Sequence, residues 1–231
     1  MHSQPAFHRW RSLFLLLVAG AAFGATNSIA NHHNEMVYFT KLVGNDWGWL
    51  TAAMIACWAV RSWLQAFVRG LAFLFPAVLA YYISDALHGT YITVDMRNPT
   101  GPKEFDLLGM LVNIFAYSVI SLLTAAVLGL LVVRIHQRGF LGLVAWMAVP
   151  SYVAWSAWHT HSYLGRTPDD PELLRVADIL FPVAIFIAVL PLLRMTFISL
   201  RHRRPPSGAV PTLPGDSTVS VMGNVRAKDS E

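Results

Sequence analysis

Histidines and one aspartate gather just beyond the ends of three apolar segments, in a pattern that could bind a divalent metal ion. Asp85 and His88 are three residues apart and can share a helical face. Imidazole and carboxylate groups are ligands for Zn²⁺, Cu²⁺ and Ni²⁺. The cofactor that this pattern predicts is a divalent metal such as zinc. The candidate ligands are Asp85, His88, His159, His161, His32 and His33.

A second interpretation of these histidines needs no metal. Histidine is amphipathic and sits comfortably at the level of lipid headgroups. No spacing here matches a strict metal-binding motif. The histidines are therefore either polar caps at the membrane interface or a site for metal binding or proton handling, and the first interpretation is the simpler one.

A polar stripe on the longest apolar segment is the second candidate site. Its residues are spaced by four, four, four and three, so they share one helical face. They are Gly109, Asn113, Tyr117, Ser121 and Thr124. The stripe either forms hydrogen bonds between helices, each worth about 0.6 kcal/mol, or lines a polar cavity. In the second case the binding residues are Asn113, Tyr117, Ser121 and Thr124.

Motifs of soluble enzymes are missing from the chain. It has no GxxxxGK[ST] loop, no GxGxxG, no HExxH and no GxSxG. No apolar run carries a charge at its centre, where ion-coupled carriers usually keep an acid. The pattern favours a protein that is not an enzyme and does not decide the question.

The elements that must position these residues are long apolar runs. The chain has 231 residues, of which 55% are hydrophobic and only 13% charged. That is about half the charge of a typical soluble protein. The net charge of +4 is spread between the runs, which argues against nucleic-acid binding. The runs cover residues 13–30, 47–60, 70–87, 107–133, 140–158 and 176–200.

Two of the six runs differ from an ordinary transmembrane helix. The first has a basic start and small residues near its end, so it is either a cleaved signal peptide or a retained helix. Gly20 and Gly24 form a GxxxG pattern that suits close helix packing in a retained helix. The second run is too short to span a bilayer unless the helix extends to about Ala66 and Arg61 reaches back to the interface.

The positions of the charges predict the orientation of the runs. Up to Arg204, ten lysines and arginines fall on one side of six spans and five on the other. All acids before the tail fall on the side with fewer basic residues. Basic residues stay in the cytoplasm. We therefore expect an all-α, polytopic membrane helix bundle with six transmembrane helices in three outward-opening hairpins, in the cell membrane, with both termini cytoplasmic.

The chain changes character near its end. Residues 205–231 are rich in Pro, Gly, Ser and Val and have no apolar period, which is typical of a disordered segment. The predicted domains are a six-helix transmembrane domain over residues 1–204 and a disordered cytoplasmic tail over residues 205–231.

Three short motifs resemble an uncharacterised family of actinobacterial integral membrane proteins. They are the Asn-Asp-Trp-Gly-Trp stretch from Asn45, Ala-Tyr-Tyr at residues 80–82, and Arg-Gly-Phe-Leu-Gly from Arg138. The resemblance spans residues 13–200, and the chain departs from the family in its histidine-rich outer loops. The resemblance implies a membrane helix fold and a membrane location, and no activity.

The sequence therefore favours a permease-like or accessory membrane component with a polar cavity that opens outward. The alternative is a membrane-embedded enzyme or metal-binding protein that uses the outer histidine and aspartate cluster. The expected partners are the lipid bilayer and either a second copy of the chain or another membrane protein.

Overall fold

The computed structural model describes residues 6–94, 103–137, 139–164 and 170–202. The chain divides into two compact units, residues 1–194 and 195–231, and all packing given below lies within the first. The predicted tail, residues 205–231, lies outside the described residues. The described residues form seven α-helices and only one short strand pair, so the fold class is all-α.

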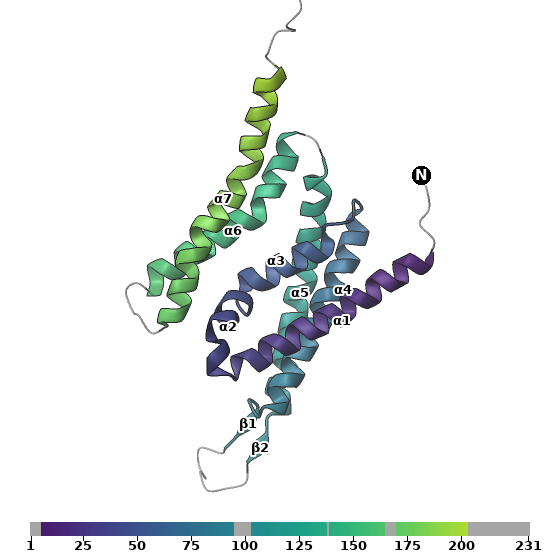
Figure 1. Ribbon diagram of the computed structural model, residues 1–231. Helices are drawn as coiled ribbons and strands as arrows, with labels where there is room; N and C mark the ends of the chain where they lie inside the picture. Colours follow the sequence, from purple (N-terminus) through teal and green to yellow (C-terminus); the bar gives the residue numbers. More distant parts are fainter. Residues whose placement is uncertain (1–5, 95–102, 138, 165–169, 203–231) are drawn as a thin grey trace, which may run out of the picture. The chain divides into compact units, whose positions relative to one another are not determined.

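The helices in chain order are α1 (Ala6–Asn31), α2 (Val37–Val43), α3 (Asp46–Cys57), α4 (Trp63–Leu87), α5 (Leu107–Ile135), α6 (Phe140–Leu164) and α7 (Pro171–His202) (Figure 1). A single 3₁₀ turn, η1 (Asn34–Met36), precedes α2. Between α4 and α5, the antiparallel strands β1 (Ile92–Thr93) and β2 (Glu104–Phe105) pair Ile92 with Phe105 and Thr93 with Glu104.

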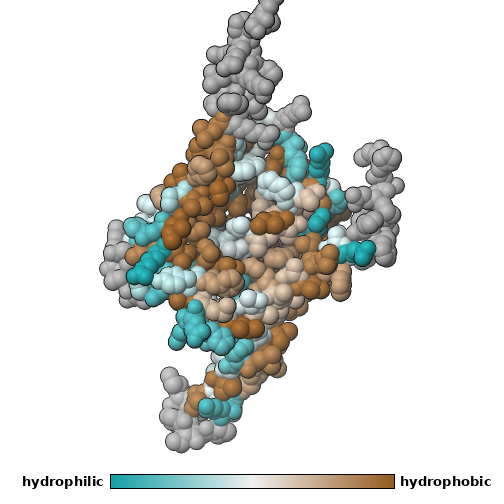
Figure 2. Space-filling view, viewed as in Figure 1, coloured by the Kyte–Doolittle hydropathy of each residue, from teal (hydrophilic) through white to brown (hydrophobic). Residues whose placement is uncertain are grey.

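Five of these helices are long and apolar enough to cross a membrane. They span Trp10–Asn31, Trp63–Leu87, Leu107–Ile135, Phe140–Tyr163 and Pro171–Leu193. Large apolar side chains such as Leu108 and Phe115 are 74% and 71% exposed. A protein surface in water rarely carries so many exposed apolar side chains. Apolar residues cover much of the described surface that faces the viewer in Figure 2. The fold is therefore that of a membrane-embedded helical protein.

The second predicted span differs from the expectation. The condition for a single spanning helix, an extension to about Ala66, is not met, because α3 ends at Cys57 and α4 begins at Trp63. The turn between them contains Arg61, whose charge keeps that position at the end of an apolar segment. With 12 residues α3 is about 18 Å long, too short by itself to cross a hydrocarbon layer of about 30 Å.

Proline residues lie inside three of the long helices without ending them. Pro76 lies within α4, Pro150 within α6, and Pro182 and Pro191 within α7. Neighbouring helices can satisfy the carbonyl groups that proline leaves free in a membrane bundle. These apolar runs therefore continue as helices through their prolines.

Helix α1 packs along α4 in the same direction. Gly20 lies against the Phe73 carbonyl and Gly24 against the Ala77 carbonyl, so the two residue numbers rise together. A Cβ atom at either glycine would collide with the α4 backbone, because the helices approach too closely for any side chain. The prediction that this GxxxG pattern suits close helix packing is confirmed.

Helix α5 packs on another side of α4 and runs in the opposite direction. Gly70 of α4 faces Ala125 of α5, and Gly129 of α5 faces Trp63 of α4. Higher residue numbers in α5 thus lie against lower residue numbers in α4. Leu128 and Val132 of α5 are fully buried in the core that forms there. Helix α4 is therefore the central element, in contact with α1, α3 and α5.

Candidate functional site

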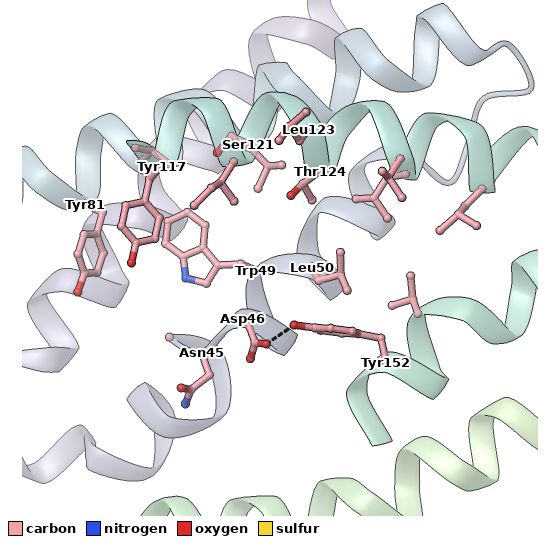
Figure 3. A pocket seen from close by; sticks show the side chains of 18 of the residues that line it. Asn45, Asp46, Trp49, Leu50, Tyr81, Tyr117, Ser121, Leu123, Thr124 and Tyr152 are labelled. Carbon is pink, nitrogen blue, oxygen red and sulfur yellow. Dashed lines mark hydrogen bonds between the residues drawn. The ribbon is translucent and has the colours of Figure 1, made fainter. Parts of the chain in front are cut away.

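Four helices line an open cavity of about 810 Å³. Its walls come from α3, α4, α5 and α6, and Figure 3 shows side chains from all four converging on it. Leu74, Val78, Leu128 and Val149 supply part of its apolar lining. Pockets that hold small molecules have volumes of about 300–1,000 Å³ and are lined mainly by apolar side chains. The cavity therefore has the size and the lining of a small-molecule site.

Several of the polar residues gather at one end of this cavity. Asn45 and Asp46 stand at the start of α3, Tyr81 and Tyr82 lie near the end of α4, and Tyr117 lies in the first half of α5. From Val127 onward, α5 contributes only apolar side chains to the lining, Val127, Leu128 and Leu131. The cavity is thus polar and aromatic at one end and apolar at the other.

Asp46 is the single charged residue among those that line the cavity. Its Oδ2 atom accepts hydrogen bonds from the hydroxyl groups of Tyr152 and Ser156, the second at 3.3 Å. The Tyr152 bond is the dashed line in Figure 3. Oδ1 accepts from the backbone N–H of Trp47 at 2.9 Å. The first turn of α3 also favours negative charge, because a helix N-terminus carries a partial positive charge.

Aromatic rings form a continuous series beside this carboxylate. Trp49 and Tyr81 meet edge to face with ring centroids 6.1 Å apart, and Tyr81 and Tyr82 do so at 5.3 Å. Tyr82 and Tyr117 are 5.7 Å apart. All four rings line the cavity. Trp49 is three residues after Asp46 in α3, so the two side chains share a helical face.

The structure divides the predicted polar stripe of α5 into two parts. Asn113 donates a hydrogen bond from Nδ2 to the hydroxyl of Tyr91 at 3.2 Å, which holds the β1 region against α5. Tyr117, Ser121 and Thr124 line the cavity. The backbone N–H of Gly109 donates to Asp106 at 2.8 Å, as part of the N-terminal cap of α5.

Three of the predicted metal ligands come together where α1 and α4 end. His32 lies 3.2 Å from Oδ1 of Asp85, and its ring stacks on that of His88 at 4.6 Å. The Ser28 hydroxyl donates to the same Asp85 oxygen at 2.6 Å. Asp85 is only 6% exposed, and its buried carboxylate is held by Ser28 of α1 and by His32, which directly follows α1. Ser28 is a partner that the sequence interpretation did not include.

The hydrogen bonds of this cluster define where its ring protons lie. Nδ1 of His88 is 2.7 Å from the Ser84 carbonyl, and a carbonyl can only accept, so Nδ1 carries a proton. Nε2 of His32 donates to the Asp85 carboxylate by the same reasoning. Each ring is thus committed to a protein acceptor through one of its nitrogens.

The other predicted ligands lie in different surroundings. His161 pairs with Asp178 at 2.7 Å, and the His159 ring packs beside Trp155 with centroids 5.7 Å apart. His33 precedes η1 and is exposed. Within the described part of the chain, no three His, Cys, Asp or Glu side chains are grouped so that they could hold a metal ion. The six predicted ligands do not form one centre.

Several residues of the cavity were not among the predicted site residues. Asp46 and Trp49 of α3 and Tyr152 of α6 were missed because the sequence pattern predicts spans and does not show which spans are neighbours. The available signal was an acid placed at the start of an apolar run and followed by tryptophans, as in Asp46-Trp47-Gly48-Trp49.

The fold and the site define the class of this protein as a membrane-embedded, all-α protein with a cavity among its helices. Comparisons with protein-family models, with curated protein sequences and with solved structures find no match.

Proposed function

We propose that this chain is a multi-pass protein of the cell membrane that binds a small molecule in the cavity, as a permease-like component open to the outer side. The observation that supports this function is the cavity of about 810 Å³ with its polar end. The proposal includes six crossings, arranged as three hairpins, with both termini in the cytoplasm.

The parallel packing of α1 and α4 supports six crossings. If two neighbouring helices run in the same direction, the segment between them must return across the membrane. Here that segment contains α2, with 7 residues, and α3, with 12. Together they extend about 28 Å, close to the hydrocarbon thickness. The second crossing is therefore a broken one, made of two short helices.

Broken crossings have a functional meaning in membrane proteins. Helix ends at membrane depth are tolerated where they line a cavity, and transporters place such ends at their binding sites. The break between α2 and α3 includes Gly44 and Asn45, and both line the cavity together with Asp46. The location of the break thus favours a binding site at this position.

The charge asymmetry supports the orientation. The first residues of α3 and the last residues of α4 lie on the side that carries most acids, which we assign as extracytoplasmic. The polar end of the cavity is on that side, because it is formed by Asn45, Asp46, Tyr81 and Tyr82. A polar entrance facing outward and an apolar interior would admit a ligand from outside.

Single-cysteine labelling tests this proposal. In a Cys57→Ser background, Thr124→Cys lies in the cavity wall, and Leu122→Cys lies on the same helix outside it, 44% exposed in the wild type. A charged, membrane-impermeant thiol reagent added to intact cells should modify Thr124→Cys and leave Leu122→Cys unmodified. Glu104→Cys should react from outside and Gln65→Cys only after permeabilisation.

Two outcomes would count against the proposal. Reaction of Gln65→Cys in intact cells would reverse the orientation. Equal protection of Thr124→Cys and Leu122→Cys would show that no water-filled path reaches the cavity from outside.

A further inference from the structure

We propose that the cavity binds an amphipathic organic cation, with its charged group at Asp46 and its apolar body against the leucine and valine lining. This inference rests on the proposed function and names the class of ligand. The charge of the cavity, its aromatic rings and its apolar interior support it together.

The charge of the cavity is unbalanced. Asp46 is the single charged residue in the lining, and its hydrogen-bond donors are two neutral hydroxyls and one backbone N–H. The ion pairs among the described residues join other groups, namely His32 with Asp85, Lys41 with Asp170 and His161 with Asp178. Asp46 itself is exposed, so a ligand can reach its carboxylate. A cationic ligand would supply the positive charge that this carboxylate lacks among its partners.

The aromatic series explains what kind of cation fits. Rings attract a positive charge at their faces, and quaternary ammonium groups are commonly recognised in this way. Trp49, Tyr81 and Tyr117 reach the polar end of the cavity from three helices (Figure 3). A bulky organic cation with little hydration suits such walls better than a small, strongly hydrated metal ion.

The apolar interior explains why the ligand must be amphipathic. Beyond the polar end, side chains such as Leu128 and Leu131 offer no hydrogen-bonding groups to a ligand. A hydrocarbon body would gain about 25 cal/mol for each Å² that it buries there. An anion would be repelled by Asp46, and an uncharged acyl chain would leave the carboxylate without a counter-charge.

Binding of tetraphenylphosphonium to the full-length protein in dodecyl maltoside tests the inference. Tetraphenylborate has the same size and shape with the opposite charge, so it serves as the matched control ligand. Saturable binding of the phosphonium ion at one site, at least about tenfold tighter than any binding of the borate ion, is expected. Asp46→Asn should weaken phosphonium binding at least about tenfold. Asp178→Asn, which removes an acid outside the cavity lining, should leave it unchanged.

A second variant, Tyr117→Leu, tests the same site if Asp46→Asn does not fold. Tyr117 is 50% exposed, so Tyr117→Leu removes a ring from the wall and little from the core. It should weaken phosphonium binding between about twofold and thirtyfold. If a short-chain phosphatidylcholine displaces the phosphonium ion, the natural ligand is a lipid with a cationic headgroup. If only free alkylammonium ions displace it, the natural ligand is a soluble cation. Either result supports a cation site.

Three results would overturn the inference. These are equal binding of the two ions, unchanged phosphonium binding in folded Asp46→Asn, and tighter binding of the borate ion. If the borate ion also shielded Thr124→Cys from its thiol reagent, the cavity would remain a small-molecule site as proposed, and only its charge preference would be wrong.

Discussion

The α1–α4 interface and the cavity lined by α3, α4, α5 and α6 show two opposite kinds of helix packing. At the interface, glycines bring two backbones into contact, and the buried Asp85 finds its donors in Ser28 and His32. In the cavity, large side chains stand apart around a space of about 810 Å³, and Asp46 has only neutral partners. At the interface, the buried carboxylate is paired within the protein. In the cavity, a carboxylate and an open volume remain available to a ligand.

This difference separates stability from function within one bundle. A membrane helix gains little from burying apolar area, so close backbone packing and interhelical hydrogen bonds hold helices together. The α1–α4 interface contains both. It also contains Asn27, whose amide is buried with no hydrogen-bond partner within the described part of the chain. We expect substitutions at the interface to lower stability and substitutions in the cavity to alter binding.

The largest effect on stability is expected from Gly24→Ala. The added methyl group would meet the backbone carbonyl of Ala77, which cannot rotate away as a side chain can. Overpacking of this kind costs about 3 kcal/mol at the upper end of the usual range. Thermal unfolding in detergent should show a clearly lowered Tm. Ala22→Leu, at an exposed position of the same helix, should change Tm little. Equal effects of the two substitutions would mean that α1 does not pack on α4.

A smaller loss of stability is expected from Asp85→Ala. The substitution leaves the buried Ser28 hydroxyl without its acceptor and removes the partner of His32. A lost partner of this kind costs about 2 kcal/mol. Asp178→Ala removes a similar pair from a site where the carboxylate is 50% exposed, and its cost should be below about 1 kcal/mol. If Asp178→Ala proved the more damaging substitution, the interface would not be the stable region that we describe.

The smallest effect is expected from the pair of Lys41 and Asp170, which links α2 to the start of α7. Burial alone would raise the pKa of Asp170, but the hydrogen bonds from Lys41 and from the Leu173 backbone lower this pKa below its ordinary value of 3.8. A lowered pKa stabilises the fold above pH 3.8, and the contribution disappears as the pH falls through the lower folded-state value.

Asp170→Asn tests this contribution, because asparagine also caps a helix well and only the charge is removed. At pH 7 the variant should lose less than about 1 kcal/mol. The difference in Tm between wild type and variant should shrink as the pH is lowered below 3.8. A difference that grew in acid would mean that the pKa of Asp170 is raised by its surroundings.

The sequence alone predicts the elements of this protein well. Five of the predicted runs fall within α1, α4, α5, α6 and α7, because the length and hydropathy of a span are properties of a continuous stretch of chain. The position of the basic residues predicts an orientation for the same local reason. The GxxxG pattern of Gly20 and Gly24 predicts close packing of a helix without naming the partner.

Only the tertiary structure decided which side chains meet. Ser28 and Asp85 are 57 residues apart, and Asp46 and Tyr152 are 106 apart. Their contacts depend on which helices are neighbours and how each is rotated about its axis, and an apolar run of any composition leaves both undetermined. The same freedom explains why the five candidate histidines, all predicted for one side, do not meet at one site. The sequence determines that these helices lie in a membrane, and the packing of their surfaces determines where a cavity remains.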